Sequence, residues 1–505
     1  MIVLINPPQL YSPTQETAGV VPPLGLAYLA AALSAEGYDV KIIDAVGECY
    51  WKNFEWEGHR LRGLNFDEIL QRIPPDSRWI GVSNLYTFAF LVSASLAEYI
   101  RKRLPKVPIV FGGAHSTIMP QYTLSRDYID AVVLSEGEIS AVQLTQAFDG
   151  EIPFNQIDGL AYRDNGETVI NPKTSFIKDL DTVPFPRRGL LPMENYYNAR
   201  EPHGNICLRK WTTMIASRGC PYGCTFCNTP EIWQRRWRIR SPENVVEEIK
   251  QLKDDFGIEE IHFEDENLCL RKDWVLKFCQ LLIDGNLNIM WQPSNGIRAE
   301  SAVDETVSAM KQAGCTNITI AAESGSPRVL KEVINKALKL EAVETAVAAI
   351  HKHKLKSAVY FMLGLPGEKK SDVFKSIALA GKLARQGANE VDFSIFSPLP
   401  GSVLMKKLVE EGRAEISEDF FDHITPHGDM LNADSYSEYI SDIQVILLKY
   451  TGYAWFYFNR LIFYPFSVIG SFINVLKDRQ TTKTERVLRT VLMRLLGKSR
   501  GEKIE

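Results

Sequence analysis

The chain has 505 residues, of which 45% are hydrophobic and 24% are charged, and its formal net charge is −5. This composition is typical of a globular protein, the length predicts roughly two to four domains, and the small negative charge gives no general attraction to nucleic acid. Residues 1–8 lack the basic and long apolar stretches of a signal peptide. Most of the eight cysteines are scattered without a disulfide framework, so we expect a cytoplasmic protein.

The N-terminal third alternates short apolar runs with helical patterns. The sequence predicts strands over residues 2–5, 40–43, 80–83, 107–111 and 131–134, and helices over 24–36 and 88–103. Alternating strands and helices predict a parallel, doubly wound sheet with helices on both faces, a Rossmann-like α/β fold. Such folds bind ligands at the carboxyl ends of their strands.

Polar and glycine-rich loops follow the predicted strands of this sheet. They contain Asn6 and Pro7, Ser83 and Thr87, Gly112, Gly113 and His115, and Glu136, Gly137 and Glu138. The glycines would let a ligand approach the backbone closely. The loops lack the GxGxxG pattern of nicotinamide-binding folds. Taken singly, each loop can also be an ordinary βα turn, and His115 can be a hydrogen-bonded loop histidine.

Residues 151–205 are predicted to form a connector. Two short apolar stretches flank Asp164-Asn165-Gly166, which is a typical hairpin turn. The stretch 180–186 contains two prolines and is expected to be extended.

Three cysteines, Cys220, Cys224 and Cys227, share one short loop with the spacing CxxxCxxC. Three thiolates can hold three corners of a four-iron four-sulfur cluster and leave the fourth iron open to a substrate or cofactor. A structural zinc site usually takes four ligands in two pairs, and no second pair is present in the sequence. An odd number of cysteines on a tight loop also argues against a disulfide.

Alternating strands and helices resume at about residue 210. Strands are predicted over 213–216, 261–264, 289–292, 318–322, 357–363 and 391–396, and helices over 242–256, 274–282, 304–313, 340–353 and 371–386. Six such units are too few for a closed eight-stranded barrel. Polar groups again follow the strands, where barrel enzymes carry out their chemistry.

The cysteine run 217–228, with the aromatic Phe226 before its last cysteine, closely resembles the signature of radical S-adenosylmethionine (SAM) enzymes. The six repeats match that family's partial (β/α)6 barrel. The resemblance implies a cluster on the three cysteines and reductive cleavage of bound SAM to a 5′-deoxyadenosyl radical. It also implies SAM-binding roles for Phe226, Asp265, Glu266, Arg298, Glu323, Ser324, Gly364, Pro366 and Gly367. Any of the carboxylates can instead cap the next helix.

Residues 1–150 resemble the cobalamin-binding domain that is fused to many radical SAM enzymes. The resemblance rests on Asn-Pro-Pro at 6–8, the run 22–30, Gly-Gly-Ala-His at 112–115 and Ser-Glu-Gly-Glu at 135–138. It implies cobalamin contacts by the ten loop residues from Asn6 to Glu138 named above. The Asp-x-His-x-x-Gly motif of other cobalamin proteins is missing, so cobalt would have no imidazole ligand from the protein.

Together the two resemblances imply a cobalamin-dependent methyltransferase that methylates an unactivated carbon of a small or lipid-like substrate. An electron donor such as flavodoxin or ferredoxin is the expected partner, and nucleic acid is not. Ring formation or rearrangement on a porphyrin- or hopanoid-like substrate is an alternative, and a non-catalytic corrinoid- or redox-sensing protein is another. Methylthiolation of tRNA would need a second cysteine trio near the N-terminus, where Cys49 stands alone.

The last hundred residues are predicted to be helical without strands. Residues 452–476 are rich in aromatics, but the uncharged stretch 461–476 is shorter than a membrane-spanning helix. Residues 477–505 contain nine Lys or Arg and four Asp or Glu, with a basic amphipathic helix near 483–496. The aromatic residues and the basic helix either pack on the barrel and face water, or contact an anionic membrane surface.

We therefore expect four parts: a Rossmann-like cobalamin-binding-type domain over 1–150, a linker with a hairpin over 151–205, a radical SAM barrel over 206–405 and a helical region over 406–505.

Overall fold

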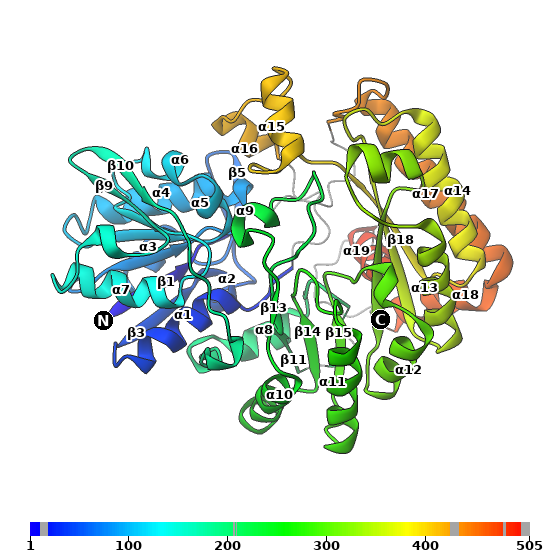
Figure 1. Cartoon of the computed structure of the whole chain (residues 1–505), viewed down its shortest axis with the longest axis horizontal. Helices are drawn as coiled ribbons and strands as arrows, with labels where there is room; N and C mark the ends of the chain where they lie inside the picture. Colours follow the sequence, from blue (N-terminus) through cyan, green and yellow to red (C-terminus); the bar gives the residue numbers. More distant parts are fainter. Residues whose placement is uncertain (11–18, 206–207, 209, 425–433, 478–480, 496–505) are drawn as a thin grey trace.

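The computed structural model describes residues 1–505 except 11–18, 206–207, 209, 425–433, 478–480 and 496–505. Two α/β units lie side by side, and the short helices α15 (Val403–Glu410) and α16 (Glu418–His423) lie above the junction between them (Figure 1).

The N-terminal unit contains one seven-stranded sheet with the strand order β10-β9-β8-β7-β6-β1-β3. The strands are β1 (Ile2–Asn6), β3 (Val40–Asp44), β6 (Ile80–Ser83), β7 (Ile109–Gly112), β8 (Ala131–Val133), β9 (Leu160–Asp164) and β10 (Glu167–Asn171). The first five pair in parallel, as the alternating pattern predicts. The predicted strands are therefore confirmed to within a residue or two.

Both faces of this sheet are buried, which makes it doubly wound. In β1, Ile2 and Leu4 pack on the face that carries α1 (Leu24–Ala35) and α7 (Glu138–Phe148), while Val3 and Ile5 pack on the face of α4 (Phe90–Arg101). All four side chains are at most 1% exposed. Because successive side chains of a strand point to opposite faces, an uninterrupted apolar run is what a strand covered on both sides requires.

The hairpin at 160–171 differs from the expected connector, because it belongs to the sheet. β9 pairs antiparallel with β8, and β10 with β9, so the hairpin extends the sheet beyond residue 150. Asn165 and Gly166 have positive φ values of 49° and 87°, as a tight two-residue turn requires.

A small sheet of β2 (Gln9–Leu10), β5 (His59–Arg62) and β4 (Asn53–Trp56) was not expected from the sequence. Its strands are short and mostly half-exposed, so they lack the apolar runs that mark the main sheet. The turn between β4 and β5 contains Glu57 and Gly58, both with positive φ.

The second unit is a partial barrel of parallel strands in the order β11-β14-β15-β16-β17-β18. The strands are β11 (Trp211–Met214), β14 (Glu260–Phe263), β15 (Met290–Pro293), β16 (Asn317–Glu323), β17 (Lys356–Leu363) and β18 (Glu390–Ile395). Two isolated parallel bridges, Trp291 to Cys315 and Ile297 to Ile320, join the two halves. The predicted six βα units are confirmed.

Five helices lie outside the barrel, and α10 shows how local sequence signals set helix ends. They are α10 (Pro242–Phe256), α11 (Lys272–Asp284), α12 (Asp304–Gln312), α13 (Leu340–Lys352) and α14 (Lys370–Arg385). In α10, the Ser241 hydroxyl accepts from the Asn244 amide at 3.1 Å, Pro242 is the first residue, and Gly257 ends the helix with a φ of 65°. A hydroxyl that caps the first turn, a proline at the first helical position and a glycine after the last turn are typical of helix ends.

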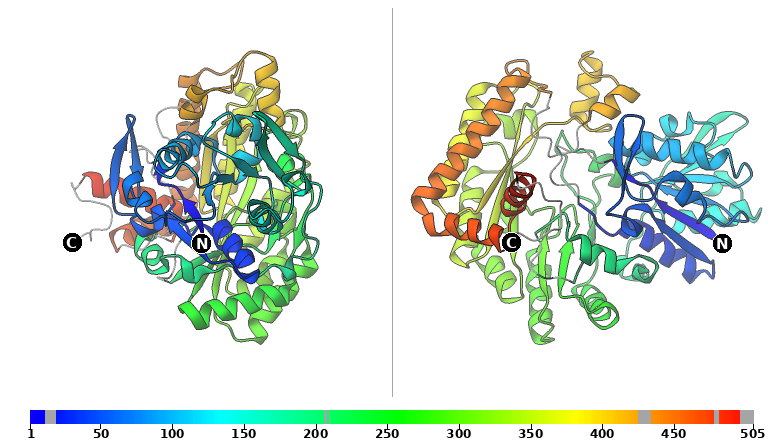
Figure 2. Two further views of the ribbon diagram at one scale, coloured as in Figure 1. Left: turned by 90° about the vertical axis from the view of Figure 1, so that its left-hand side faces the viewer. Right: turned by 180° about the vertical axis from the view of Figure 1, so that it is seen from behind.

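The C-terminal region is helical where it is described, as predicted, but it does not form one separate unit. α17 (Asp442–Phe463) packs along α14 on the outer side of the barrel, and α18 (Pro465–Leu476) and α19 (Lys483–Leu495) follow it (Figure 2). By contrast, Phe421 of α16 is fully buried in the core of the N-terminal unit, against Phe90 and Tyr122. Among the described helices, none is both long and apolar enough to cross a membrane.

Candidate active site at the mouth of the barrel

The three cysteines lie on a loop between β12 (Ser217–Arg218) and α9 (Thr229–Trp233), at the carboxyl end of the first barrel strand. Gly219 turns the chain into this loop with a φ of 86°, and a Cβ there would lie 2.1 Å from the Arg236 carbonyl oxygen. Farther along, the amide and hydroxyl of Thr225 donate to the carbonyls of Ile334 and Val333 at 3.1 and 2.7 Å. The loop is therefore anchored to the opposite side of the barrel mouth.

All three cysteines line one cavity of about 190 Å³. The other lining residues are Tyr222, Phe226, Thr229, Glu266, Asn267, Asn295, Gly296, Ile297, Arg298, Ala321, Glu323 and Lys336. No three His, Cys, Asp or Glu side chains of the described chain converge closely enough to hold a single metal ion. Three thiols around a cavity of this size fit a larger iron–sulfur cluster with room for a bound cofactor.

The thiols are shielded from water in this cavity. Burial raises the pKa of Cys224 to about 11, although the nearby Lys336 opposes the shift, and burial also raises the pKa of Cys227. Cysteine binds iron as the thiolate, so iron binding at this site releases protons.

The two predicted acids after β14 play different parts. Asp265 is buried and does not line the cavity; its carboxylate accepts from the Ala216 amide at 3.1 Å and from the Ser217 hydroxyl at 2.6 Å, and it also accepts from the Ser217 amide. Burial raises its pKa to about 7. Glu266 faces the cavity and accepts from the Gly219 amide at 3.1 Å and from the Trp233 indole at 2.8 Å. Asp265 therefore holds the start of the cysteine loop in place, whereas Glu266 accepts a hydrogen bond on each of its two oxygens and presents its carboxylate to the cavity.

Arg298 and Glu323 both reach the cavity, as predicted. The Arg298 guanidinium lies 3.9 Å from the centre of the Tyr222 ring. Glu323 accepts from Lys336 at 2.9 Å, and its backbone has a φ of 62° at a register shift between β16 and β17. A non-glycine residue in this conformation carries strain, which is often found at functional sites.

The structure does not bring the other predicted SAM residues into the cavity lining. Ser324 is buried behind it, with its hydroxyl 3.4 Å from that of Ser376. Gly364, Pro366 and Gly367 form the turn after β17, where the Gly364 carbonyl accepts from Tyr436 and the Gly367 amide donates to Glu438. A SAM contact by these four residues stays a prediction.

Several lining residues were missed by the sequence analysis, including Asn267 and Lys336. Asn267 is 2% exposed, and neither atom of its amide group has a partner among the described residues. It therefore offers a donor and an acceptor to a bound molecule. Its position directly after the acidic pair Asp265-Glu266 could have identified it as a site residue from the sequence. Lys336 comes from a distant loop, and its sequence carried no such signal.

The N-terminal sheet presents the carboxyl ends of its strands to the cysteine loop. Arg218, just before the first cysteine, pairs with Glu136 at 2.7 Å and with Glu138 at 2.5 Å. Arg238 also pairs with Glu136, at 2.9 Å. The loop after β8 therefore docks on the barrel mouth, which places the predicted corrinoid loops beside the cysteines.

Other predicted cobalamin residues share this edge but already have protein partners. The Asn6 amide donates to Asp44 at 2.8 Å, and His115 Nδ1 lies 3.1 Å from the Thr87 hydroxyl. His115 is 2% exposed between the rings of Phe90 and Phe421, and burial lowers its pKa to about 3. Cobalamin contacts by the ten residues, including Pro7, Ser83, Gly112, Gly113 and Gly137, stay predictions.

Next to them, the loop after β6 keeps two large side chains exposed, Leu85 at 52% and Tyr86 at 59%. An apolar surface at the carboxyl edge of the sheet fits a broad, flat cofactor such as a corrin ring.

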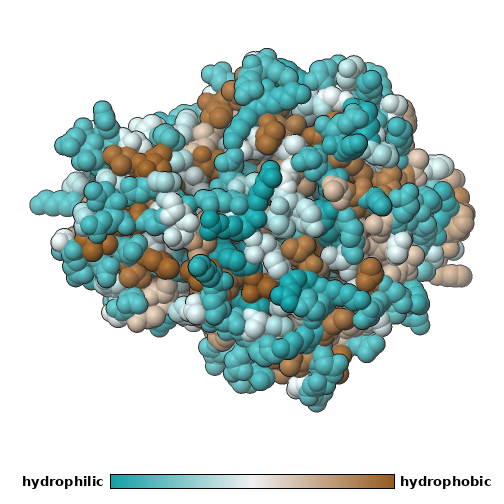
Figure 3. Space-filling model, viewed as in Figure 1, coloured by the Kyte–Doolittle hydropathy of each residue, from teal (hydrophilic) through white to brown (hydrophobic). Residues whose placement is uncertain are grey.

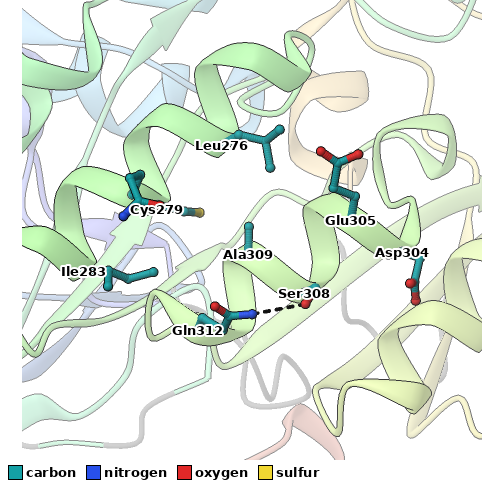
Figure 4. Close-up of a pocket in the computed structure, with 9 residues that line it drawn as sticks. Leu276, Cys279, Ile283, Asp304, Glu305, Ser308, Ala309 and Gln312 are labelled. Carbon is teal, nitrogen blue, oxygen red and sulfur yellow. Dashed lines mark hydrogen bonds between the residues drawn. The ribbon is translucent and has the colours of Figure 1, made fainter.

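A second, larger hollow of about 480 Å³ lies far from this chemistry, on the outer side of the barrel between α11 and α12 (Figure 4). It is open and lined by helix side chains such as Leu276, Ser308 and Gln312. None of the three cluster cysteines lines it.

Comparisons with known proteins agree with this architecture. Residues 214–380 match the family model of the radical SAM superfamily, and residues 14–145 match that of the B12 binding domain. The chain is 32% identical over 404 residues to an "uncharacterized methyltransferase" of Pyrococcus horikoshii, covering 80% of this chain and 82% of that protein. It is 27% identical to cytidylyl-2-hydroxyethylphosphonate methyltransferase of Streptomyces wedmorensis, covering 79% and 80%.

Among solved structures, the fold is similar to that of the radical SAM methyltransferase TsrM from Kitasatospora setae with cobalamin and a four-iron four-sulfur cluster bound. The TM-score is 0.64 at 19% identity, over 81% of this chain and 78% of that one. The chain thus belongs to the radical SAM superfamily, in the group whose members carry a B12-binding domain ahead of the radical SAM domain, and its cofactors are SAM, a four-iron four-sulfur cluster and cobalamin.

Proposed function

We propose that this enzyme transfers a methyl group from SAM to a carbon atom of a small substrate, with cobalamin as the carrier. The observation that carries the proposal is the docking of the two units. The ion pairs of Arg218 with Glu136 and Glu138 hold the carboxyl edge of the N-terminal sheet against the cysteine loop. A methyl carrier and a radical-generating site must be adjacent to act on one substrate.

The residues of the cavity suit SAM, which carries a positive sulfonium and amino group. Glu266 and Glu323 supply negative charge, Asn267 supplies an unpartnered amide, and Phe226 offers an aromatic face to the adenine. When bound, the cluster supplies the electron that cleaves SAM, and cobalamin supplies the methyl group. The protein's part is to hold these groups in place and to exclude water.

The test is an anaerobic assay of the reconstituted enzyme with S-adenosylmethionine labelled as a CD3 group, a low-potential reductant and a small-molecule cell extract. Mass spectrometry should find an acceptor that gains an intact CD3 group, together with 5′-deoxyadenosine or S-adenosylhomocysteine.

A new product without the label would instead support ring formation or rearrangement. That alternative has support from the 27% identity to anaerobic magnesium-protoporphyrin IX monomethyl ester cyclase of Rubrivivax gelatinosus, over 81% of this chain. Corrinoid binding without any SAM turnover would support a sensing protein. A one-electron donor such as flavodoxin or ferredoxin is the proposed physiological reductant.

We also propose that the chain contacts anionic membranes through an apolar face of α17 and α18. Figure 3 shows apolar residues gathered along the edge that these helices form. Ten large apolar side chains of the two helices are more than half exposed: Ile443, Leu447, Phe458, Leu461, Ile462, Phe463, Phe466, Ile469, Phe472 and Leu476. Exposed lysines, such as Lys375 and Lys477, lie on α14 and directly after α18. An apolar face with flanking cations suits an anionic lipid surface.

The basic helix α19 was expected to face water or a membrane surface, but its cationic side chains bind to the protein itself. Lys483 donates to the Tyr360 hydroxyl, Arg486 donates to the Pro202 and Gly204 carbonyls at 2.8 and 3.1 Å, and Arg489 is 6% exposed. These charged side chains pack against the barrel and linker, so they are neither solvated nor available to lipid.

A further inference from the structure

An ion pair and a buried hydroxyl lie beside the cysteine cavity, on the side where the N-terminal sheet docks. Glu264 and Ser294 directly follow β14 and β15, His203 comes from the linker, and Tyr86 comes from the loop after β6. His203 Nδ1 lies 3.1 Å from Glu264 Oε2. The pKa of Tyr86 is raised by desolvation and, to a smaller extent, by the charge of Glu264.

Two of these groups have buried polar atoms without a partner. Ser294 is 4% exposed, and its hydroxyl makes no hydrogen bond to any described residue. The same holds for Glu264 Oε1, while Oε2 is the oxygen that faces His203. A buried acceptor or hydroxyl that makes no hydrogen bond destabilises the protein, so such groups point to a bound molecule.

The backbone on either side of His203 is held in place by packing and hydrogen bonds. A Cβ on the next residue, Gly204, would lie 2.9 Å from the Ser294 hydroxyl oxygen and 2.7 Å from Gln292 Oε1, so glycine permits the close approach. From the other side, Arg486 of α19 holds the carbonyls of Pro202 and Gly204. The C-terminal helix therefore positions His203 at the barrel mouth.

The chemistry of the pair defines what it can bind. A carboxylate only accepts, so Nδ1 of His203 donates to Glu264, and Nε2 of the neutral ring is left as an acceptor. Glu264 Oε1 is a second acceptor, and Ser294 can donate or accept. Asn295 and Glu266, one and two residues farther along, line the SAM cavity. A group bound here therefore lies beside the reacting cofactors.

We propose that His203 and Glu264 form the substrate anchor: they bind an amine or hydroxyl that the substrate carries near the carbon to be methylated, with Ser294 completing the site. This inference rests on the proposed methyl transfer. It assigns the substrate to the class of small polar molecules with a hydrogen-bond donor.

The test uses the CD3-labelled SAM and cell-extract assay with four variants of the reconstituted enzyme. H203Q and E264Q change the anchor. H353Q and D304N are matched controls, because His353 Nε2 and Asp304 Oδ1 form a similar pair at 2.9 Å on the outer side of the barrel. The anchor variants should lower kcat/KM for the labelled acceptor about tenfold to a hundredfold, mainly through KM, because a hydrogen bond to a charged group is lost. Controls should match the wild type.

Iron content and SAM cleavage without acceptor separate loss of the anchor from loss of the folded site. Both should be unchanged in H203Q and E264Q, which shows that the folded site is intact. Wild-type kinetics in both anchor variants would overturn the anchor while leaving methyl transfer standing. Absence of any CD3-labelled product from the wild type would contradict the proposed function and the anchor together. Capping the amine or hydroxyl of the labelled acceptor should abolish its methylation, and an acceptor that has neither group would also overturn the anchor.

Discussion

Arg218 donates to the carboxylate of Glu138 at 2.5 Å, and this contact joins the cysteine loop to the first turn of α7 in the N-terminal unit. Both side chains are at most 10% exposed. The pair therefore couples the position of the iron-binding loop to that of the sheet expected to carry cobalamin.

Breaking this pair should loosen the junction. Because the buried Arg218 loses one of its two carboxylate partners and keeps Glu136, E138Q should lower the free energy of unfolding by about 2 kcal/mol. Burial acts to raise the pKa of Glu138, but the charge and the hydrogen bond of Arg218, a backbone amide and the charge of Lys173 together lower it. This stabilisation is therefore present above the unfolded pKa of about 4.5 and is lost as the pH falls through the lower folded value. Thermal unfolding at pH 7 and at lower pH measures it. The exposed pair Lys272–Glu305 supplies the control E305Q, which should change little. Equal effects of the two substitutions would contradict the coupling.

Replacing Cys220, Cys224 or Cys227 by alanine should abolish cluster assembly. Each variant loses one of three thiolate ligands to iron. Iron and sulfide analysis after anaerobic reconstitution, with SAM cleavage as a second measurement, tests this. C49A is the control, since Cys49 belongs to the N-terminal unit and does not line the cysteine cavity, so this variant should leave the iron content unchanged. A triple variant that keeps full iron and SAM cleavage would refute the site.

Glu368 should make the protein less stable in mildly alkaline solution. Burial raises its pKa to about 8 from an ordinary 4.5, so the folded state favours the neutral acid. Stability from this group is complete below pH 4.5 and is lost as the pH rises through about 8. E368Q keeps an oxygen to accept from the Gly364 amide, which now donates at 2.7 Å. Its melting temperature should rise relative to the wild type between about pH 6 and pH 8.5. A constant difference over this range would mean that the carboxyl does not titrate there.

Liposome flotation tests the membrane surface. The double variant F466E/F472E adds charge to two side chains that are 86% and 56% exposed, so it should no longer float with vesicles of phosphatidylcholine and phosphatidylglycerol at low salt. Substitutions suit this test better than truncation, because α17 buries Phe456 against the barrel.

The control is W51E, which changes an apolar side chain that is 62% exposed on the N-terminal unit and should float like the wild type. If the wild type fails to float and light scattering shows a dimer that the double variant loses, the face binds a second copy of the chain instead.

Much of the architecture could be predicted from the sequence because the signals are local. The apolar run of β1 requires burial on both faces, and the Ser241, Pro242 and Gly257 signals mark the ends of α10. The cysteine spacing likewise predicts its chemistry, since three thiolates on one loop suit few other sites.

Tertiary structure alone decided which polar residues reach the site. Asp265 and Glu266 are neighbours in sequence, yet one supports the loop and the other faces the cavity, because successive side chains after a strand point to opposite sides. Lys336, His203 and Phe421 reach their places through long-range packing, in which segments far apart in the chain meet. No local pattern encodes such contacts, because their free energy arises only when both partners are already in place.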